Sequence, residues 1–384
     1  MQHYNYIKII IILILFSISE LYHIYYINLI IFKDENIIES KIYEKFNKIK
    51  DKISYSPIKG IINKIKIISH IFNKNIDYIK NGKKIIHITV SINNKNVYKY
   101  ILLVQMQSLL MNCDKNSTFI VYHLLCTSDF SELSIIIFKS LFIHFSNNLE
   151  MIFYNMGNIF LNDIQKKEYS ANYFRLFTPL IINEDRIIHL DADSLIFSDL
   201  KEMYDLDFND NYVLGFYDVI ADGVDYLGIE SSKYINTGVI LFNLKKLRND
   251  KKFIEIIALL NKNIELRKYD QDVINYLLYP NIGRLPSKYG IFNFEDKTDL
   301  NIYLNLLRTK VPLLELEEAL KKPGIVHLVL CGPKPYYPNS FYYKKFTNCS
   351  QRLNCSCKKY FNIWHSIAEK TYYYGKIKSL IGIR

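Results

Sequence analysis

Cysteine and clustered positive charge are both scarce in this sequence, and each scarcity limits what the protein can be. Lysine and arginine together number 49 against 38 acidic residues, which gives a formal net charge of +11. The lysines are scattered, however, and form no stripe interleaved with aromatic side chains of the kind that binds nucleic acid. We therefore expect no nucleic-acid partner, since surface lysine or a groove for an anionic ligand accounts for the charge.

The six cysteines are unevenly spaced along the chain. Three of them crowd a short polar stretch near its end: Cys349, Cys355 and Cys357. A zinc site would need a fourth ligand at matching spacing, and the nearest histidine, His365, lies well outside the cluster. A local disulfide is therefore favoured over zinc, with free thiols as the remaining alternative.

Composition and length indicate one large folded domain with an N-terminal appendage. The apolar fraction is 49% and the charged fraction 23%, a balance typical of globular proteins. Because single α/β domains often exceed about 200 residues, one such domain fits this length better than two equal ones. We assign residues 1–32 to a membrane-directed segment, residues 33–82 to a stem or linker, and residues 83–375 to the main domain.

The N-terminal segment is apolar enough to enter a membrane. Ile9–Phe16 is an uninterrupted apolar run, and a second run extends from residue 21 to residue 32. Together they predict a hydrophobic helix that spans the bilayer as a signal anchor, although Glu20, His23 and Asn28 would lie within it at a cost in free energy. A cleaved signal peptide is the alternative.

Two signals about localisation oppose each other. The lysines after the apolar segment outnumber those before it, which by the positive-inside rule opposes a lumenal main domain. Three N-glycosylation sequons favour one: Asn116-Ser117-Thr118, Asn348-Cys349-Ser350 and Asn354-Cys355-Ser356. We expect a protein of the endomembrane system, Golgi or ER, with a lumenal main domain and membrane contact through the N-terminal segment.

From residue 84 onward, strand patterns alternate with helical patterns. Buried strands are expected at residues 84–90, 118–125, 149–154 and 186–190, and helices at residues 97–111, 132–145 and 173–182. This alternation predicts an α/β, Rossmann-like fold with a mixed, mostly parallel sheet between layers of helices. Ligands in such folds bind beyond the carboxyl ends of the strands.

Two aspartates stand at one such strand end. Asp191 and Asp193 directly follow the apolar strand at residues 186–190. Because side chains two residues apart point to the same side of an extended chain, both carboxylates can reach one hard cation such as Mn²⁺ or Mg²⁺. Such a cation could bridge diphosphate oxygens and neutralise charge on a leaving group. The alternative is that both are ordinary turn or capping aspartates.

Four blocks occur in order at residues 186–200, 234–244, 269–275 and 325–335. Together they resemble glycosyltransferase family 8, whose retaining enzymes include glycogenin and bacterial lipopolysaccharide galactosyltransferases. Arg186 to Leu200 surrounds the two aspartates, and Tyr234 to Leu244 contains an Asn-Thr-Gly segment. Tyr269 to Asn275 contains Asp-Gln-Asp, and Ile325 to Pro335 contains a histidine followed by Gly-Pro-Lys-Pro. Four ordered blocks are more specific than any single one. The resemblance implies a type A glycosyltransferase fold and a catalytic domain over residues 83–375.

The resemblance implies a metal site and a diphosphate site. Asp191, Asp193 and His327 would bind Mn²⁺ or Mg²⁺, because an imidazole completes a carboxylate set for such a cation. Lys334 and the backbone near Gly332 would hold the diphosphate, since an ammonium group is a strong partner for phosphate oxygens. Without the resemblance, His327 would be interpreted as a structural histidine, because it ends an apolar run.

The resemblance also implies which residues face the transferred sugar. Gln271 and Asp270 would lie close to its reactive carbon, and Asp218 would bind its hydroxyl groups. The nucleotide-sugar contacts would come from Ser91, Asn93, Arg175, Ala192, Asn236, Gly238, Gly332 and Lys334. If the protein supplies a nucleophile or a stabilising dipole, the candidates are Gln271, Asp270 and Asp272, and a front-face mechanism that needs no nucleophile is the alternative.

Two positions depart from the family pattern. Asn93 and Asn96 occur where the first strand of the family commonly ends in an aspartate that reads uracil, although the amide of Asn93 can still pair with a base. Tyr336 stands where the family often has tryptophan. UDP remains the expected nucleotide. The expected reaction transfers a hexose, glucose or galactose, from a UDP-sugar to a glycan, glycolipid or glycoprotein acceptor.

Two other functions are compatible with parts of the sequence. Leu190 to Ser194 also resembles the first motif of haloacid-dehalogenase-like phosphatases, but three predicted strands precede it and no later paired acidic motif follows. A catalytically silent transferase fold that acts as a scaffold would be expected to lack a metal or phosphate ligand. The sequence retains all of these ligands.

Overall fold

The computed structural model describes most of the expected main domain. The described residues are 63–329, with gaps at 74, 158, 160–169, 219–223, 261–265, 294–304, 306 and 308–310, together with 334–336 and 356–380. The membrane segment at residues 1–32, the sequons at Asn348 and Asn354, and the side chains of the cysteine cluster lie outside them, so the expectations about these features stay predictions. Within the described residues, no helix combines the length and apolar character needed to cross a membrane.

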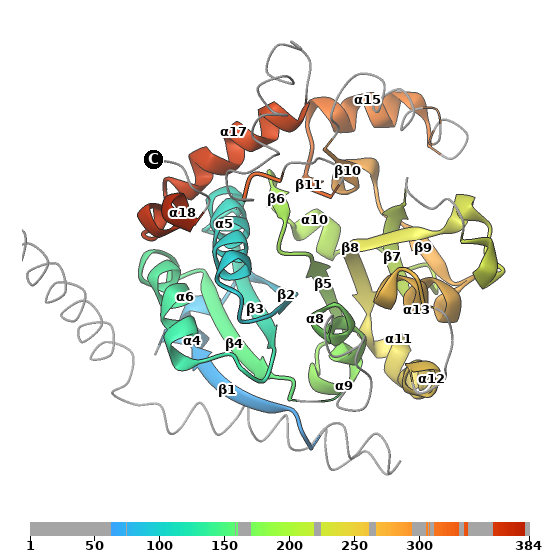
Figure 1. Ribbon diagram of the computed structural model, residues 1–384, viewed down its shortest axis with the longest axis horizontal. Helices are drawn as coiled ribbons and strands as arrows, with labels where there is room; N and C mark the ends of the chain where they lie inside the picture. Colours follow the sequence, from blue (N-terminus) through green and yellow to red (C-terminus); the bar gives the residue numbers. More distant parts are fainter. Residues whose placement is uncertain are drawn as a thin grey trace, which may run out of the picture.

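A twisted eight-stranded sheet forms the centre of the molecule (Figure 1). In spatial order its strands are β1 (Lys66–Ile71), β4 (Leu149–Asn155), β3 (Thr118–Cys126), β2 (Lys84–Ile92), β5 (Arg186–Leu190), β8 (Ile235–Asn243), β7 (Val213–Tyr217) and β9 (Ile282–Arg284). Strands β2 to β5 are mutually parallel, and β7 and β9 run in the same direction. Strands β1 and β8 run antiparallel to their neighbours. The sheet is therefore mixed and mostly parallel, as predicted.

The predicted elements form where the apolar patterns place them. β3 is buried along its whole length, as a continuous apolar run in a parallel sheet should be. Helix α6 (Glu132–Phe145) begins after Ser131, whose side chain accepts a hydrogen bond from the backbone N–H of Ser134. The helix expected at residues 173–182 is instead three short pieces, α8 (Ser170–Tyr173), η1 (Phe174–Phe177) and α9 (Thr178–Ile181), of which α9 has a proline in its first turn.

The sheet begins earlier in the chain than the boundary expected at residue 83. Strand β1 lies within the stretch assigned to a stem, and it pairs with β4 along the edge of the sheet. His70 Nε2 lies 2.8 Å from Glu150 Oε1, and Lys80, at the end of α4 (Ile76–Lys80), donates to the other oxygen of Glu150. A buried carboxylate on β4 therefore fixes both β1 and α4, so residues 66–80 belong to the folded domain.

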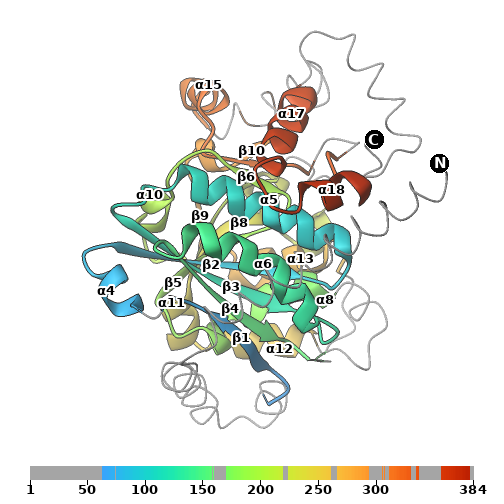
Figure 2. The same cartoon turned by 90° about the vertical axis from the view of Figure 1, so that its left-hand side faces the viewer.

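Helices cover both faces of the main sheet (Figure 2). One face packs against α5 (Asn96–Asn112), α6, α17 (Ser356–Ala368) and α18 (Tyr374–Leu380), and the core there includes the fully buried Trp364. The other face packs against α8, α9, α11 (Leu244–Asn249), α12 (Lys252–Leu260) and α13 (Tyr269–Leu278). The predicted three-layer α/β architecture is confirmed.

A small second sheet lies beyond the end of β5. It consists of β10 (Ile291–Phe292), β11 (Ile325–His327) and β6 (Ser194–Ile196), with β11 in the middle. β11 runs antiparallel to β6, and His327 is paired with Ser194. Because β6 follows the Asp-Ala-Asp turn directly, this pairing places His327 next to the two aspartates.

Candidate active site

A cleft of about 900 Å³ lies at the carboxyl ends of the parallel strands, where the architecture predicts a ligand site. The predicted site residues that line it are Ser91, Asn93, Arg175, Asp191, Ala192, Asp193, Asp218, Asn236, Asp270, Gln271, His327 and Lys334. Gly238 lies behind His327 and Asp191, and Gly332 lies outside the described residues. Residues far apart in the chain thus converge on one cleft.

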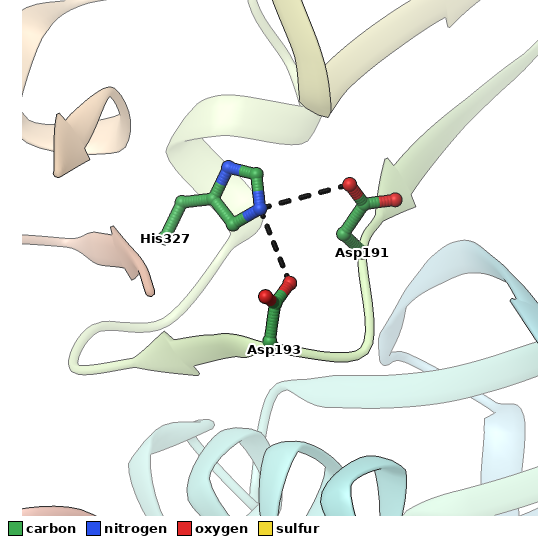
Figure 3. Close-up of side chains that lie close together, drawn as sticks. All are labelled: Asp191, Asp193 and His327. Atoms are coloured by element: carbon green, nitrogen blue, oxygen red, sulfur yellow. Dashed lines mark hydrogen bonds and ion pairs between the residues drawn. The ribbon is translucent and has the colours of Figure 1, made fainter. Parts of the chain in front are cut away.

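Asp191, Asp193 and His327 form a compact cluster (Figure 3). His327 Nε2 lies 3.2 Å from Asp193 Oδ1 and 3.6 Å from Asp191 Oδ2. One ligand atom from each of the three residues lies within 4.8 Å of the others. Two carboxylate oxygens and one imidazole nitrogen suit Mn²⁺ or Mg²⁺, so the residues present fit the predicted metal site.

The backbone around the cluster holds the three side chains in place. Asp191 N–H donates to the carbonyl of Gly238 at 2.7 Å, and Leu328 N–H donates to the carbonyl of Asp193 at 2.9 Å. Asn236 Oδ1 lies 3.2 Å from His327 Nδ1, on the side of the ring away from the aspartates. A hydrogen bond there leaves Nε2 free to bind a cation. The buried His327 therefore presents Nε2 to the two aspartates, an arrangement that could hold a cation.

Gly238 provides the space for the imidazole. A Cβ atom at residue 238 would lie 2.1 Å from His327 Cε1 and 2.8 Å from Asp191 Oδ2. No real Cβ contact is that short, so any larger residue would displace the histidine or the aspartate. Gly238 was predicted as a nucleotide-sugar contact, and in this structure it lies behind His327 and Asp191, two of the predicted metal ligands.

Arg175 lies almost fully buried between two carboxylates. Its Nη2 donates to Asp191 Oδ1 at 2.6 Å, and its Nε lies 3.0 Å from Asp270 Oδ2. Nη1 donates to the carbonyl of Thr237 at 2.5 Å. The guanidinium group thus links Asp191, and with it the cluster of Asp191, Asp193 and His327, to the first turn of α13.

Charge holds both aspartates of the cluster ionised. Burial on its own would raise the pKa of Asp191, but the Arg175 charge and a hydrogen bond from His189 outweigh it and lower that pKa. For Asp193, Lys334 and His327 likewise overcome the effect of burial and lower the pKa. Anionic carboxylates are what a divalent cation requires.

Lys334 and Tyr336 contact the same aspartate. Lys334 Nζ donates to Asp193 Oδ2, and Tyr336 Oη donates to that oxygen at 3.0 Å. Both residues follow the small sheet and line the cleft. The ammonium group predicted to hold the diphosphate therefore lies directly beside the metal cluster.

Asp270 is buried in the first turn of α13. Burial is the largest influence on its carboxyl group, and together with the charge of Asp191 it outweighs Arg175 and raises the pKa of Asp270 to about 7. Thr237 Oγ1 lies 3.4 Å from Asp270 Oδ2 and donates to it. The oxygen nearest Arg175 is therefore already engaged by two donors.

Gln271 and Asp218 lie next to each other in the lining of the cleft. Gln271 Oε1 accepts a hydrogen bond from the backbone N–H of Thr237 at 3.1 Å, and Gln271 Nε2 donates to Asp218 Oδ2 at 2.6 Å. Lys268 Nζ lies 3.6 Å from the same oxygen of Asp218. Lys268 could not be predicted as a cleft residue, because a lysine in a lysine-rich chain carries no signal of its own.

Asp272 has a different environment from its neighbours in the Asp-Gln-Asp block. It is fully buried, and its two oxygens accept hydrogen bonds from the hydroxyl groups of Tyr226 at 2.5 Å and Tyr234 at 2.6 Å. Considered as a nucleophile from the sequence, it instead organises the wall of the cleft. The spacing of two residues from Asp270 does not reveal this difference.

The opposite end of the cleft is formed by the loop after β2. Asn93 Oδ1 accepts from the backbone N–H of Lys95 at 3.0 Å, which shapes this loop. The buried hydroxyl of Ser91 has no hydrogen-bond partner among the described residues and lines the cleft. Both residues are placed where a nucleotide could reach them.

The family model described as Glycosyl transferase family 8 matches residues 87–335 of this chain. The chain is also similar to lipopolysaccharide 1,2-glucosyltransferase of Escherichia coli (strain K12), at 30% identity over 169 residues, 39% of this chain and 48% of that protein. General stress protein A of Bacillus subtilis (strain 168) is 24% identical over 194 residues, 46% of this chain and 65% of that protein. The chain thus spans less than two thirds of the length of these relatives.

Two solved structures share the fold. The WbbM bifunctional glycosyltransferase has a TM-score of 0.62 at 18% identity, covering 78% of this chain and 52% of that one. The galactosyltransferase LgtC in complex with donor and acceptor sugar analogs has a TM-score of 0.51 at 22% identity, covering 70% of this chain and 96% of that one. These likenesses support the type A glycosyltransferase fold expected from the sequence.

The region matched by the family model contains the predicted site residues that line the cleft. The matched region, residues 87–335, is well over half of the chain, and all four blocks singled out in the sequence contribute described residues to the cleft. The resemblance to haloacid-dehalogenase-like phosphatases was confined to one short motif and has no such support. This protein belongs to glycosyltransferase family 8.

Proposed function

We propose that the protein is a metal-dependent, retaining glycosyltransferase that moves a hexose, glucose or galactose, from a UDP-sugar to a glycan, lipid or protein acceptor. The observation that carries the proposal is the cluster of Asp191, Asp193 and His327 beside Lys334 within a single cleft. A hexose is supported by the relatives, because one is named a glucosyltransferase and one a galactosyltransferase.

In this proposal each end of the cleft binds one part of the donor. Asp191, Asp193 and His327 would hold Mn²⁺ or Mg²⁺, which when bound supplies Lewis-acid stabilisation of the diphosphate oxygens. Lys334 would place its positive charge beside the leaving diphosphate and stabilise it. Ser91 and Asn93 are available to the nucleotide at the other end.

The sugar would lie against Gln271 and Asp218, whose amide and carboxylate can bind its hydroxyl groups. Asp270 is poorly placed to attack the sugar, because its Oδ2 already pairs with Arg175 and accepts from Thr237. A front-face reaction, in which the leaving phosphate guides the acceptor, fits this arrangement better than a covalent intermediate on Asp270. The role of Asp270 is then to hold Arg175, which in turn holds Asp191.

Donor cleavage by the purified full-length chain tests the proposal. We expect UDP release from one member of a panel of sugar nucleotides in the presence of Mn²⁺, and loss of that release in excess chelator. Asp191→Ala and Asp193→Ala should lower the rate by roughly 10²- to 10³-fold, the cost typical of losing an electrostatic stabiliser.

Asp185→Ala is the matched control, because that aspartate lies on the surface with its side chain 67% exposed. Circular dichroism should show that all three variants are folded. Turnover of either cluster variant at the wild-type rate would remove the aspartates from the metal site. A folded protein that releases no nucleotide from any donor, with or without candidate acceptors, would favour the scaffold function instead.

A further inference from the structure

Helix α5 carries polar side chains along one face of a largely apolar sequence. Gln105, Ser108 and Asn112 are three and four residues apart, so they lie on the same side of the helix. Gln105 and Ser108 are buried, with exposed fractions of 1% and 0%. Because a buried polar group costs free energy unless it is hydrogen-bonded, this face of α5 is explained by what it binds.

The polar face of α5 binds the chain segment that runs from Asp191 to Ile196, and α5 packs beside β6 (Figure 1). Gln105 Nε2 donates to the carbonyl oxygen of Asp191 at 2.6 Å. At the other end of the segment, Ser108 Oγ accepts from the backbone N–H of Ile196 at 3.0 Å. Asn112 Nδ2 donates to the carbonyl oxygen of Ile196, also at 3.0 Å. Helix α5 thus fixes both ends of the segment that contains the Asp-Ala-Asp turn.

The carbonyl oxygen of Asp191 accepts two hydrogen bonds. One comes from the backbone N–H of Ser194 at 3.1 Å and closes a turn over residues 191–194. The other comes from Gln105 and fixes the plane of the peptide that follows Asp191. Because this plane sets the direction in which the chain reaches Asp193, the amide of Gln105 helps to determine how the two carboxylates lie relative to each other.

The amide group of Gln105 is only half satisfied. A carbonyl oxygen can only accept, so the amide nitrogen must face Asp191 and Oε1 must point elsewhere. Gln105 Oε1 is buried and has no hydrogen-bond partner among the described residues. An unpartnered buried oxygen lowers stability and offsets the hydrogen bond that the same side chain makes. Holding the turn is therefore a better explanation of this glutamine than stabilising the core.

Gln105 acts on the turn from outside the cleft. It is not among the described residues that line the cleft, whereas Asp191 and Asp193 are. Its effect on a bound ligand would therefore pass through the turn. Metal ligands have to be held within about 0.5 Å of their productive positions, and the loss of a residue that supports them typically lowers metal affinity about 10- to 100-fold.

We propose that Gln105 is a positioning residue for the predicted cation site, because it holds the turn after β5 in the conformation that directs Asp191 and Asp193 towards one ion. The inference rests on the proposed function and adds to it a residue that lies outside all four sequence blocks. A single glutamine within an apolar helix gives no local signal of such a role, which depends on the packing of α5 against the turn.

Calorimetry with Mn²⁺ on the free full-length protein tests this role. Gln105→Met keeps the length and helix propensity of the side chain but removes the donor. We expect its affinity for Mn²⁺ to be about tenfold weaker than that of wild type. Gln107→Met is the matched control, because Gln107 is a buried glutamine of the same helix, 7% exposed, that makes none of the hydrogen bonds described above. It should bind Mn²⁺ as wild type does.

Urea unfolding of the metal-free protein separates positioning from a general structural role. In Gln105→Met the carbonyl oxygen of Asp191 keeps its hydrogen bond from Ser194, and the unpartnered Oε1 is removed. The urea midpoint should therefore stay close to that of wild type. Under the proposed function, donor cleavage by this variant should need about tenfold more Mn²⁺ to reach half of its maximal rate.

Equal Mn²⁺ affinity in wild type and Gln105→Met would remove the role of Gln105 and leave the proposed function intact. A Gln105→Met protein that is unfolded or much less stable without metal would assign the effect to the packing of α5, as would an equal loss of affinity in Gln107→Met. Wild type that binds no Mn²⁺ would overturn the predicted cation site, and this role with it.

Discussion

At residue 238 the absence of a side chain lets His327 and Asp191 lie close together. The imidazole of His327 and the carboxylate of Asp191 occupy the space that a Cβ atom would take. The family resemblance identified the Asn-Thr-Gly segment but assigned its glycine to the nucleotide sugar. In the structure the glycine leaves room for His327 and Asp191, two of the predicted metal ligands.

Gly238→Ala should therefore weaken metal binding while leaving the fold intact. The added methyl group would lie 2.1 Å from His327 Cε1, so the imidazole must move away from the aspartates. We expect affinity for Mn²⁺ to fall by at least about tenfold, measured by calorimetry on the free protein. Gly375→Ala is the matched control, because a Cβ there would meet nothing within 4 Å. Equal affinity in both variants would show that the cluster tolerates the shift.

Sequence reasoning identified the chemistry-bearing residues of the site but not the contacts between them. Asp191 and Asp193 could be predicted because a strand precedes them and only two residues separate them. The bridge from Asp191 through Arg175 to Asp270 joins parts of the chain that have no periodic relation. The different roles of Asp270 and Asp272 likewise depend on which neighbour each carboxylate meets in the fold.

At the scale of elements, long buried strands and helices could be predicted and short or edge elements could not. The predicted and observed bounds of α6 coincide at Glu132–Phe145, because its apolar face and its serine cap are both local signals. β11 has three residues, too few for any pattern, and its place is set by pairing with β6. β1 was assigned to a stem because residues 33–82 are rich in lysine, asparagine and isoleucine and show no strand-turn rhythm. Its place in the sheet depends on pairing with β4, where His70 meets Glu150 far along the chain.

Glu150→Gln tests how strongly β1 and α4 are attached to the sheet. Burial would raise the pKa of Glu150, but hydrogen bonding by His70 and the charge of Lys80 lower it from 4.5 to about 2. A shift of that size corresponds to roughly 3 kcal/mol of stability at neutral pH. The variant should lose stability of that order in urea unfolding at pH 7.

The stability that Glu150 contributes should change with pH in a definite direction. Because the folded-state pKa of Glu150 is the lower one, its contribution is complete above about 4.5 and is lost as the pH falls towards about 2. The difference in unfolding free energy between wild type and Glu150→Gln should therefore shrink across that interval. Glu255→Gln, at an exposed residue with its side chain 49% exposed, should show little difference at any pH. A difference in unfolding free energy that stays constant with pH would mean that the loss of stability does not come from the charge of Glu150.

At the scale of the whole molecule, the cluster of Asp191, Asp193 and His327 joins the two sheets. Asp191 follows β5 of the main sheet, whereas His327 ends β11 of the small sheet. A bound cation would tie Asp193 to His327 across 134 residues of chain. Metal binding and the stability of the whole domain should therefore be linked.

Thermal unfolding measures this linkage. At a Mn²⁺ concentration of 100 times the Kd, binding to the folded state alone stabilises it by about 2.7 kcal/mol, which we expect to raise the Tm of the full-length protein by about 5 °C. His327→Ala should abolish the increase, whereas His144→Ala, at an exposed histidine of α6, should keep it. An increase that persists in His327→Ala would mean that the cation binds elsewhere.

The order of the strands along the chain also determines when the cleft can be completed during synthesis. β9, at residues 282–284, is the last strand of the main sheet, and His327 and Lys334 follow it. A nascent chain can therefore contain every described strand of the main sheet while it still lacks His327 and Lys334. Under the proposed function, a chain that stops before residue 327 should cleave no donor, because the predicted cation and diphosphate sites would both be incomplete.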